Sequence, residues 1–195
     1  AAAMTFGPMS LAQQAPEKKD VTIAVGGKSL YYYLPLSIAE QLGYFKDEGL
    51  NVKIVDFQGG SRSLQAVVGG SADVVSGAFE HTISMQAKKQ PMTAFVLQGR
   101  APQLALVVSN KTMKDYKQLS DLKGKKVGVT APGSSSQMVA NFILKKGGLG
   151  PKDVAFIGVG SSSGAVSAIR SGQIDALINL DPVITILLKN GDAKL

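Results

Sequence analysis

Residues 52–75 read VKIVDFQGGSRSLQAVVGGSADVV, and the same pattern returns 102 positions later in VAFIGVGSSSGAVSAIRSGQIDAL, residues 154–177. Five of the 24 paired positions are identical without a gap. Each copy has a strand pattern, a turn, a helix pattern, Gly-x-x-Asp and a second strand pattern. The identical pairs are Val52 and Val154, Ser61 and Ser163, Ala66 and Ala168, Gly70 and Gly172, and Asp73 and Asp175. This repeat predicts two similar α/β lobes.

Apolar strand patterns alternate with helix patterns along the rest of the chain. The strand patterns cover residues 21–26, 51–57, 73–78, 92–97, 104–109, 126–131, 154–159 and 176–180. The first helix pattern has Leu34, Ile38, Leu42 and Phe45 on one face, at helical spacing. Strand, helix and strand in this order indicate parallel sheets with right-handed crossovers. We expect the run at 104–109 to complete the first half.

Serines mark the predicted starts of several helices. Ser61 is placed to cap a helix over 61–68, and Ser134 with Gln137 forms a capping-box pattern for a helix over 135–146. A further helix is expected at about 81–89. Unpaired amides and the helix dipole favour an anion or a carbonyl oxygen at such ends, so several turns in one cleft would hold a solute. Simple N-capping explains each serine taken alone.

Aromatic residues follow two of the predicted strands. Tyr31, Tyr32 and Tyr33 precede the first helix, and Phe79 follows the third strand. An amphipathic ring at the mouth of a cleft suits a ligand wall, and ordinary core packing is the alternative. The sequence does not indicate which of the three tyrosines faces the cleft.

The composition excludes several classes of function. The 195 residues are 45% hydrophobic and carry a net charge of +7, which suits one or two small soluble domains. Only three of the 21 basic residues are arginine, and the lysines are scattered, so we expect no nucleic-acid partner. There is no cysteine, hence no disulfide, thiolate metal site or cysteine nucleophile.

The glycine turns lack the residues that catalysis would need. Residues 160–164, GSSSG, match the nucleophile-elbow pattern with Ser162 as nucleophile, but the single histidine, His81, precedes it instead of following it. A third glycine is missing from the dinucleotide pattern that starts at Gly158, and no Walker lysine is present. We therefore expect no enzyme activity, no cofactor and no metal.

The first 15 residues, AAAMTFGPMSLAQQA, differ from the rest of the chain. They are small, apolar and uncharged, and two of their triplets end in alanine, as signal-peptidase sites do. We expect the tail of an export signal here, with an expression scar or a disordered tail as the alternative. No later run approaches a membrane span, so the mature protein is predicted to be soluble and periplasmic, without a lipid anchor.

Four stretches carry a resemblance to a known family. They are AEQLGYFKDEGLNVKIV (39–55), GGSADVVSGA (69–78), LSDLKGKKVGV (119–129) and SGQIDALINLDP (171–182). The chain resembles the extracytoplasmic solute-binding proteins of ABC importers in the nitrate, sulfonate and taurine group, which share their fold with the NMT1/THI5-like thiamine-pyrimidine proteins. The resemblance implies an α/β, two-lobed type II periplasmic-binding-protein fold with parallel-core sheets and a solute held between the lobes.

By position, the resemblance points to the turns that follow the strands as the solute site. The candidate ligand-binding residues are Ser29, Tyr31, Tyr32, Gln58, Gly59, Gly60, Ser61, Gly77, Ala78, Phe79, Ser134, Ser135, Ser136, Gly160, Ser161, Ser162 and Asp181. Asp181 stands before Pro182, where many relatives have an acidic residue before proline.

One departure from the family concerns the C-terminal part of the chain. In the family the chain crosses back from the second lobe to complete the first, and this sequence stops at GDAKL, where that strand would begin. We expect residues 1–19 to be the signal remnant and tail, 20–109 the first part of lobe 1, and 110–195 lobe 2, with the return segment absent.

The function that these observations favour is the solute-binding component of an ABC importer. It would hold a small anionic or aromatic nitrogen- or sulfur-containing solute, as a monomer, and deliver it to a permease in the inner membrane. A thiamine-pyrimidine or menaquinone-pathway enzyme on the same fold is one alternative. The effector-binding domain of a transcription regulator is another; it would need a helix-turn-helix upstream, where this sequence has the signal-like stretch at 1–15 instead.

Overall fold

The computed structural model describes residues 16–195, and its strands form two separate sheets. The first sheet has the order β2-β1-β3, and its neighbouring strands are parallel. Its strands are β1 (Asp20–Val25), β2 (Asn51–Asp56) and β3 (Val74–Ser76). The export signal expected in residues 1–15 lies outside the described residues.

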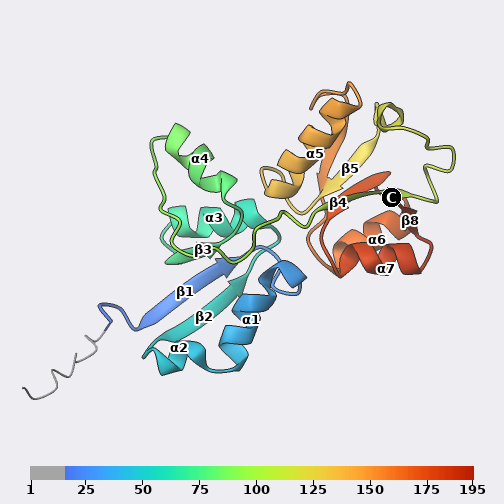
Figure 1. Ribbon diagram of the computed structural model, residues 1–195. Coiled ribbons are helices and arrows are strands. Elements are labelled where there is room, and N and C mark those ends of the chain that lie inside the picture. The colour runs from blue at the N-terminus through green and yellow to red at the C-terminus, as the bar shows by residue number, and fades with distance from the viewer. Residues whose placement is uncertain (1–15) are drawn as a thin grey trace, which may run out of the picture.

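The second sheet has five strands in the order β6-β5-β7-β4-β8. Its strands are β4 (Ala105–Ser109), β5 (Lys126–Val129), β6 (Ala155–Gly158), β7 (Ala176–Asn179) and β8 (Ala193–Lys194). β5 runs parallel to β6 and β7, whereas β4 is antiparallel to β7 and β8. Figure 1 shows the two sheets in separate lobes, so the predicted two-lobed α/β fold is confirmed.

Helices cover both sheets. They are η1 (Tyr31–Tyr33), α1 (Leu34–Gln41), α2 (Tyr44–Asp47), α3 (Gly60–Val68), α4 (Glu80–Ala87), η2 (Leu119–Leu122), α5 (Ser135–Lys146), α6 (Ser163–Ser171) and α7 (Val183–Lys189). In the second lobe, α5 lies on one side of the sheet and α6 and α7 lie on the other (Figure 1). Two adjacent residues of β4 belong to two different hydrophobic clusters of this lobe. Val107 packs in the cluster that contains Leu187 of α7, and Val108 packs in the cluster that contains Leu144 of α5. None of the helices in residues 16–195 is long and apolar enough to cross a membrane.

The internal repeat has a matching structural role in each lobe. The Asp73 carboxylate accepts the Thr22 amide of β1 at 2.9 Å, and the Asp73 amide donates to the Thr22 carbonyl at 2.9 Å. In the same way, the Asp175 carboxylate accepts the Lys126 amide of β5 at 2.9 Å, and the Asp175 amide donates to the Lys126 carbonyl at 2.8 Å. Each aspartate therefore fixes the register of the strand that follows it against a neighbouring parallel strand, β3 against β1 and β7 against β5.

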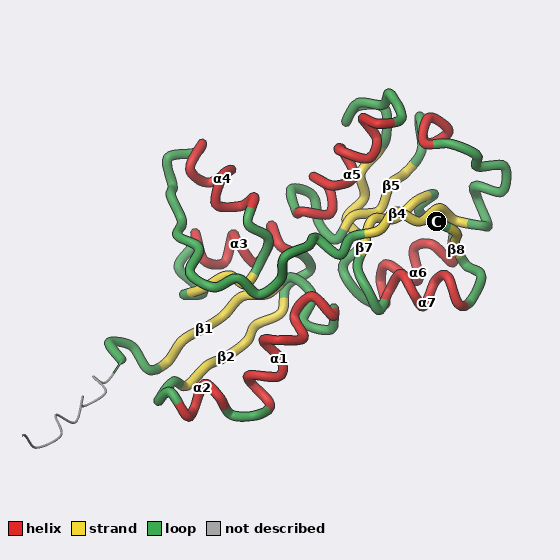
Figure 2. Tube along the Cα trace, viewed as in Figure 1, coloured by secondary structure: helices red, strands yellow, loops and turns green. Residues whose placement is uncertain are grey.

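The strand at 104–109 is a correction to the expected organisation. β4 pairs with β7 in the second sheet, not with the first half, and the loop before it runs from the first lobe to the second (Figure 2). A strand pattern shows that a segment pairs, but it does not show with which sheet. The boundaries expected for the two lobes, and the family's return segment, stay predictions.

The strand predicted at 92–97 does not form. Residues 91–99 have no regular structure, and Phe95, Val96 and Leu97 are exposed. A β-type run needs a neighbour for its backbone groups, and within residues 16–195 no strand lies on the second edge of β3. In the second lobe β7 is the strand equivalent to β3, and its edge away from β5 is paired with β4.

The predicted apolar face of the first helix is mostly uncovered. Leu34, Ile38 and Leu42 are exposed, and Leu36 packs against the first core instead. The helix also stops at Gln41, because Gly43 adopts φ +80° and is the N-cap of the next helix, α2. Helical spacing identified an apolar stripe correctly, but it does not tell whether another element packs on it.

Asp73 gives the fold a testable pH dependence. The Lys18 ammonium at 2.6 Å and the Thr22 amide together lower the pKa of Asp73 below its ordinary value of 3.8. A lowered folded pKa gives stability that is present above the unfolded pKa and is lost as the pH falls through the folded value.

We expect Asp73→Asn to lower the urea unfolding midpoint near pH 7, and the difference from wild type to shrink below about pH 4. Asp115→Asn, at an exposed position, is the control and should stay close to wild type throughout. A difference between Asp73→Asn and wild type that stays constant down to acid pH would show that the carboxylate charge is not the stabilising feature.

Candidate functional site

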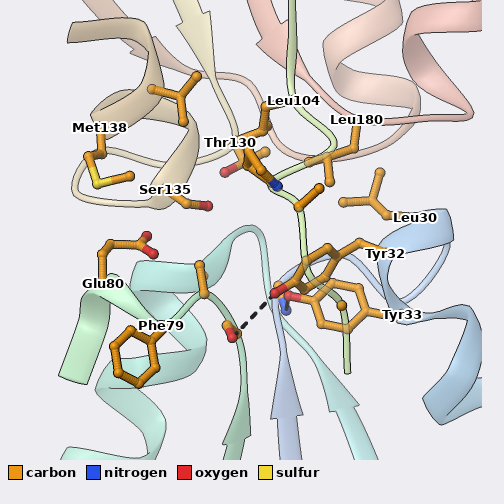
Figure 3. Close-up of a pocket in the computed structure, with 18 of the residues that line it drawn as sticks. Leu30, Tyr32, Tyr33, Phe79, Glu80, Leu104, Thr130, Ser135, Met138 and Leu180 are labelled. Atoms are coloured by element: carbon orange, nitrogen blue, oxygen red, sulfur yellow. Dashed lines mark hydrogen bonds between the residues drawn. The ribbon is translucent and has the colours of Figure 1, made fainter. Parts of the chain in front are cut away.

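A cavity of about 210 Å³ lies between the two lobes, at the carboxyl ends of their parallel strands. Gly26 follows β1, Gly77 follows β3 and Thr130 follows β5, and all three line the cavity. This is the edge at which ligands bind in open parallel sheets. Figure 3 shows side chains from both lobes around it.

Two tyrosines form one wall of the cavity. The Tyr32 and Tyr33 rings meet edge to face, with centroids 5.0 Å apart. The Tyr32 hydroxyl donates to the Gly77 carbonyl at 3.4 Å, and the Tyr33 hydroxyl accepts from the Gly26 amide at 3.2 Å. Burial raises the pKa of Tyr33 to about 12, so its hydroxyl stays protonated. The wall is therefore a fixed, uncharged pair of rings, whereas Tyr31 is 61% exposed and lies outside it.

Apolar side chains supply most of the remaining surface. Leu30, Leu104 and Leu180 line the cavity. Leu30 and Leu180 are also part of the hydrophobic cluster that contains Ile23 and Val25 of β1, and Leu104 packs against that cluster. Leu104 and Leu180 come from the segments next to β4 and β7, so second-lobe strands reach into the first core. The base of the cavity is thus the place where the chain passes between lobes.

The opposite side of the cavity is more open. Phe79 lines it and is 67% exposed, and Met138 projects from α5 (Figure 3). Exposed apolar groups beside a cavity are available to cover a bound molecule.

Four polar side chains accompany this apolar surface: Glu80, Arg100, Thr130 and Ser135. Thr130 is fixed by Ser136, whose hydroxyl accepts the Thr130 amide at 3.0 Å and lies 2.9 Å from its hydroxyl. The Oε1 atom of Glu80 is buried and has no hydrogen-bond partner among the described residues. Glu80 was not predicted as a site residue, because in the sequence it is only the neighbour of a lone histidine.

The structure brings six of the predicted site residues to the cavity. They are Tyr32, Gly60, Gly77, Ala78, Phe79 and Ser135. The others do not line it: Ser29, Tyr31, Gln58, Gly59, Ser61, Ser134, Ser136, Gly160, Ser161, Ser162 and Asp181. Solute binding by any of the 17 stays a prediction.

Ser61 and Ser134 hydrogen-bond to each other across the lobes. The Ser134 hydroxyl accepts the Ser61 amide at 2.9 Å and lies 3.1 Å from the Ser61 hydroxyl, which donates to the Pro132 carbonyl at 2.8 Å. Ser134 is only 2% exposed. These serines therefore join α3 to the start of α5.

The predicted capping box at the start of α5 does not form. Ser134 occupies the N-cap position without a side-chain capping bond, and the Gln137 side chain accepts the Gly133 amide at 2.7 Å. Because Ser134 is engaged by Ser61, its hydroxyl does not cap its own helix. Ser61 lies inside α3, which starts one residue earlier, at Gly60.

The turn at 160–162 also joins the lobes instead of lining the cavity. Ser161 lies against Gly27, where a side chain on the glycine would collide with it, and Gln58 lies close to Gly160. The Asp181 carbonyl accepts the Tyr31 amide at 3.0 Å, and its carboxylate accepts the Thr185 amide at 2.9 Å. The Tyr31–Asp181 hydrogen bond and the approach of Ser161 to Gly27 bring turns of the two lobes together, whereas the Thr185 bond is local to the start of α7.

His81 is buried behind the cavity. Its Nε2 atom has no partner among residues 16–195 and lies near Gly60. Burial lowers its pKa, and the neighbouring Glu80 charge only partly opposes this, so the imidazole is neutral at neutral pH. Neither His81 nor Ser162 lines the cavity. The described residues also contain no group of three or more histidine, aspartate or glutamate side chains able to hold a metal ion.

Comparisons with known proteins agree with this architecture. The family described as NMT1/THI5 like matches residues 31–188. A solved structure from Bordetella bronchiseptica RB50 is 64% identical, with a TM-score of 0.89, over 91% of this chain and 56% of that one. The alkanesulfonate-binding protein SsuA from Xanthomonas axonopodis pv. citri, bound to MOPS, has a TM-score of 0.69 at 23% identity, over 93% of this chain and 61% of its own. The latter likeness concerns the fold alone.

A curated relative carries the name of an enzyme. The 4-amino-5-hydroxymethyl-2-methylpyrimidine phosphate synthase of Schizosaccharomyces pombe is 27% identical over 162 residues, which are 83% of this chain and 45% of the synthase. The chain spans about half the length of the curated relatives it matches.

The serine bridge between the lobes leads to a stability prediction. We expect Ser134→Ala to lower the free energy of unfolding by about 1–2 kcal/mol, because the Ser61 amide then loses its acceptor in a partly buried place. Urea unfolding measures the loss.

Ser162→Ala is the matched control for this prediction. Ser162 is exposed and makes no side-chain capping bond, so its replacement should change the free energy of unfolding by less than about 0.5 kcal/mol. If the two variants lose the same free energy of unfolding, the hydrogen bonds of Ser134 contribute no more to stability than an exposed serine does.

Proposed function

Since the chain belongs to the NMT1/THI5-like family, we propose that it is the extracytoplasmic solute-binding component of an ABC importer. The observation that carries this proposal is the cavity between the lobes, lined from both sides at the ends of the strands. A molecule placed there contacts Tyr32 and Phe79 of one lobe and Ser135 and Met138 of the other. Binding is therefore coupled to the arrangement of the lobes.

The coupling follows from the contacts that a solute would add. The hydrogen bonds between Ser61 and Ser134 already stabilise the arrangement in which the two lobes are in contact. A solute that touches both lobes binds this arrangement better than a separated one, and it can shift the equilibrium only by that difference in affinity. An importer could use the shift to distinguish loaded protein from empty protein.

The proposed solute is small and is either anionic or an aromatic compound that contains nitrogen or sulfur, in the range of nitrate, sulfonates and taurine. The cavity volume of about 210 Å³ suits a small molecule. The Tyr32 and Phe79 rings offer surfaces for stacking. Gly60 and Ser135, at the first turns of α3 and α5, bring helix N-termini to the same cavity, where acceptor oxygens are favoured.

The proposed surroundings are the periplasm and an inner-membrane permease, with the protein acting as a monomer. The alkanesulfonate-binding relative shares the fold and supports a solute-binding role for this architecture. Export and the absence of a lipid anchor belong to the same proposal.

A synthase is the second candidate, because a curated relative carries that name. The cavity weighs against it. His81 does not line the cavity, and neither does Ser162. The polar side chains that do line it include no histidine, cysteine or lysine, so a nucleophile there would have only the Glu80 carboxylate as a base.

A thermal-shift and calorimetry screen of the purified protein tests the binding role. Suitable probes are nitrate, alkanesulfonates, taurine, aromatic carboxylates and pyrimidines. A probe at about 100 times its dissociation constant should stabilise the protein by roughly 2.7 kcal/mol and be recovered unchanged. Conversion of the probe into a product would favour the synthase.

The Phe79→Ala variant then locates the binding. We expect it to weaken the best probe by about 3- to 10-fold through lost stacking, while the ligand-free unfolding midpoint stays near that of wild type because the ring is exposed. Ile83→Ala, an exposed residue on α4 that does not line the cavity, should leave affinity unchanged. Equal affinities for the two variants would place the bound probe elsewhere.

A further inference from the structure

Glu80 brings a carboxylate to the cavity whose Oε1 atom has no hydrogen-bond partner in the described part of the chain. It is the first residue of α4, is half-buried, and lines the cavity. Its Oε1 atom is shielded from water and accepts no hydrogen bond from any residue in 16–195. An acceptor left in this condition is costly, and more so when it belongs to a charged group. The cost is offset if a bound molecule supplies the missing donor.

Within residues 16–195, no lysine or arginine forms an ion pair with this carboxylate. Arg100 is the only basic residue that lines the cavity, but it is exposed and forms no ion pair with Glu80 in the described part of the chain. His81, the adjacent titratable side chain, is uncharged at neutral pH because burial lowers its pKa. The negative charge of Glu80 is therefore available to a bound molecule.

The position of the Glu80 side chain in the cavity determines which kind of solute could bind beside it. Figure 3 shows the Glu80 carboxyl group and the Ser135 side chain on the same side of the cavity, both directed into it. Ser135 begins α5, whose N-terminal end would otherwise attract an anionic solute. The Glu80 carboxylate lines the same cavity, so a second anionic group bound near that helix end would share the cavity with a like charge.

We propose that Glu80 selects solutes that carry an N–H donor, such as an amine, amidine or amino-substituted heterocycle, and disfavours those whose only polar group is an oxyanion. This inference rests on the proposed solute-binding function and narrows it. The donor binds Glu80 at its buried oxygen, and the apolar body of the solute packs against Tyr32 and Met138. Arg100, on another part of the lining, remains available to an acidic group on the same molecule.

Matched probe pairs test this selectivity by calorimetry on the purified protein. The pairs are taurine with ethanesulfonate, and benzylamine with benzoate. Taurine is ethanesulfonate with an added amine, and benzylamine carries an ammonium group in place of the carboxylate of benzoate. We expect the amine of each pair to bind at least about 10-fold more tightly. Glu80→Gln keeps the shape of the side chain and removes its charge, so it should reduce amine binding by about 10-fold or more.

Two further variants keep the test decisive. Glu80→Lys reverses the charge and should reverse the preference, so that ethanesulfonate and benzoate bind better than their partners. Glu17→Gln, an exposed glutamate outside the cavity, is the control and should bind as wild type does. Ligand-free urea midpoints show whether each variant is folded.

The outcomes separate this inference from the function on which it rests. If ethanesulfonate or benzoate binds the wild-type protein more tightly than its amine partner does, the protein binds solutes but Glu80 does not select for a donor. The same conclusion follows if Glu80→Gln leaves both members of a pair unchanged. Failure of every probe in the wild-type protein and in all variants would contradict both proposals.

Discussion

The close approach of the turns of the two lobes is the constraint on which the rest of the structure depends. A side chain added at Gly59 would lie 2.9 Å from the Thr130 hydroxyl and 3.0 Å from Ala131, and Gly27 has no room beside Ser161. Only residues without a Cβ atom allow the backbones to meet so closely. This contact brings the carboxyl ends of β1, β3 and β5 around one cavity, and the serine bridge follows from it.

Much of the fold could be predicted from the sequence because it depends on local patterns. The repeat around Asp73 and Asp175 predicted equivalent strands, and each aspartate makes the same pair of hydrogen bonds in its lobe. The helix over 135–146 was predicted with the bounds that the structure shows. Predictions failed where the outcome depends on a distant partner. The run at 92–97 has no neighbouring strand, and the run at 104–109 pairs with a sheet that is formed mainly by later residues.

The candidate site was predicted only in outline for the same reason. The sequence indicated turns rich in glycine and serine, and six of their residues reach the cavity. It could not show that the Ser134 hydroxyl would hydrogen-bond to Ser61, because 73 positions separate the two residues. It also gave no reason to choose Glu80, whose importance comes from a buried Oε1 atom that has no hydrogen-bond partner in residues 16–195. A missing hydrogen bond is a property of the three-dimensional arrangement and leaves no trace in a pattern.

Hydrogen exchange measured with and without a bound solute tests most directly whether the two lobes act as one binding unit. Protection should rise together at residues 77–80 of the first lobe and 130–138 of the second, because both segments line the cavity. Residues 44–56, which lie in α2 and β2 away from it, should exchange at unchanged rates. Protection confined to one lobe, or to segments outside the cavity, would contradict the account.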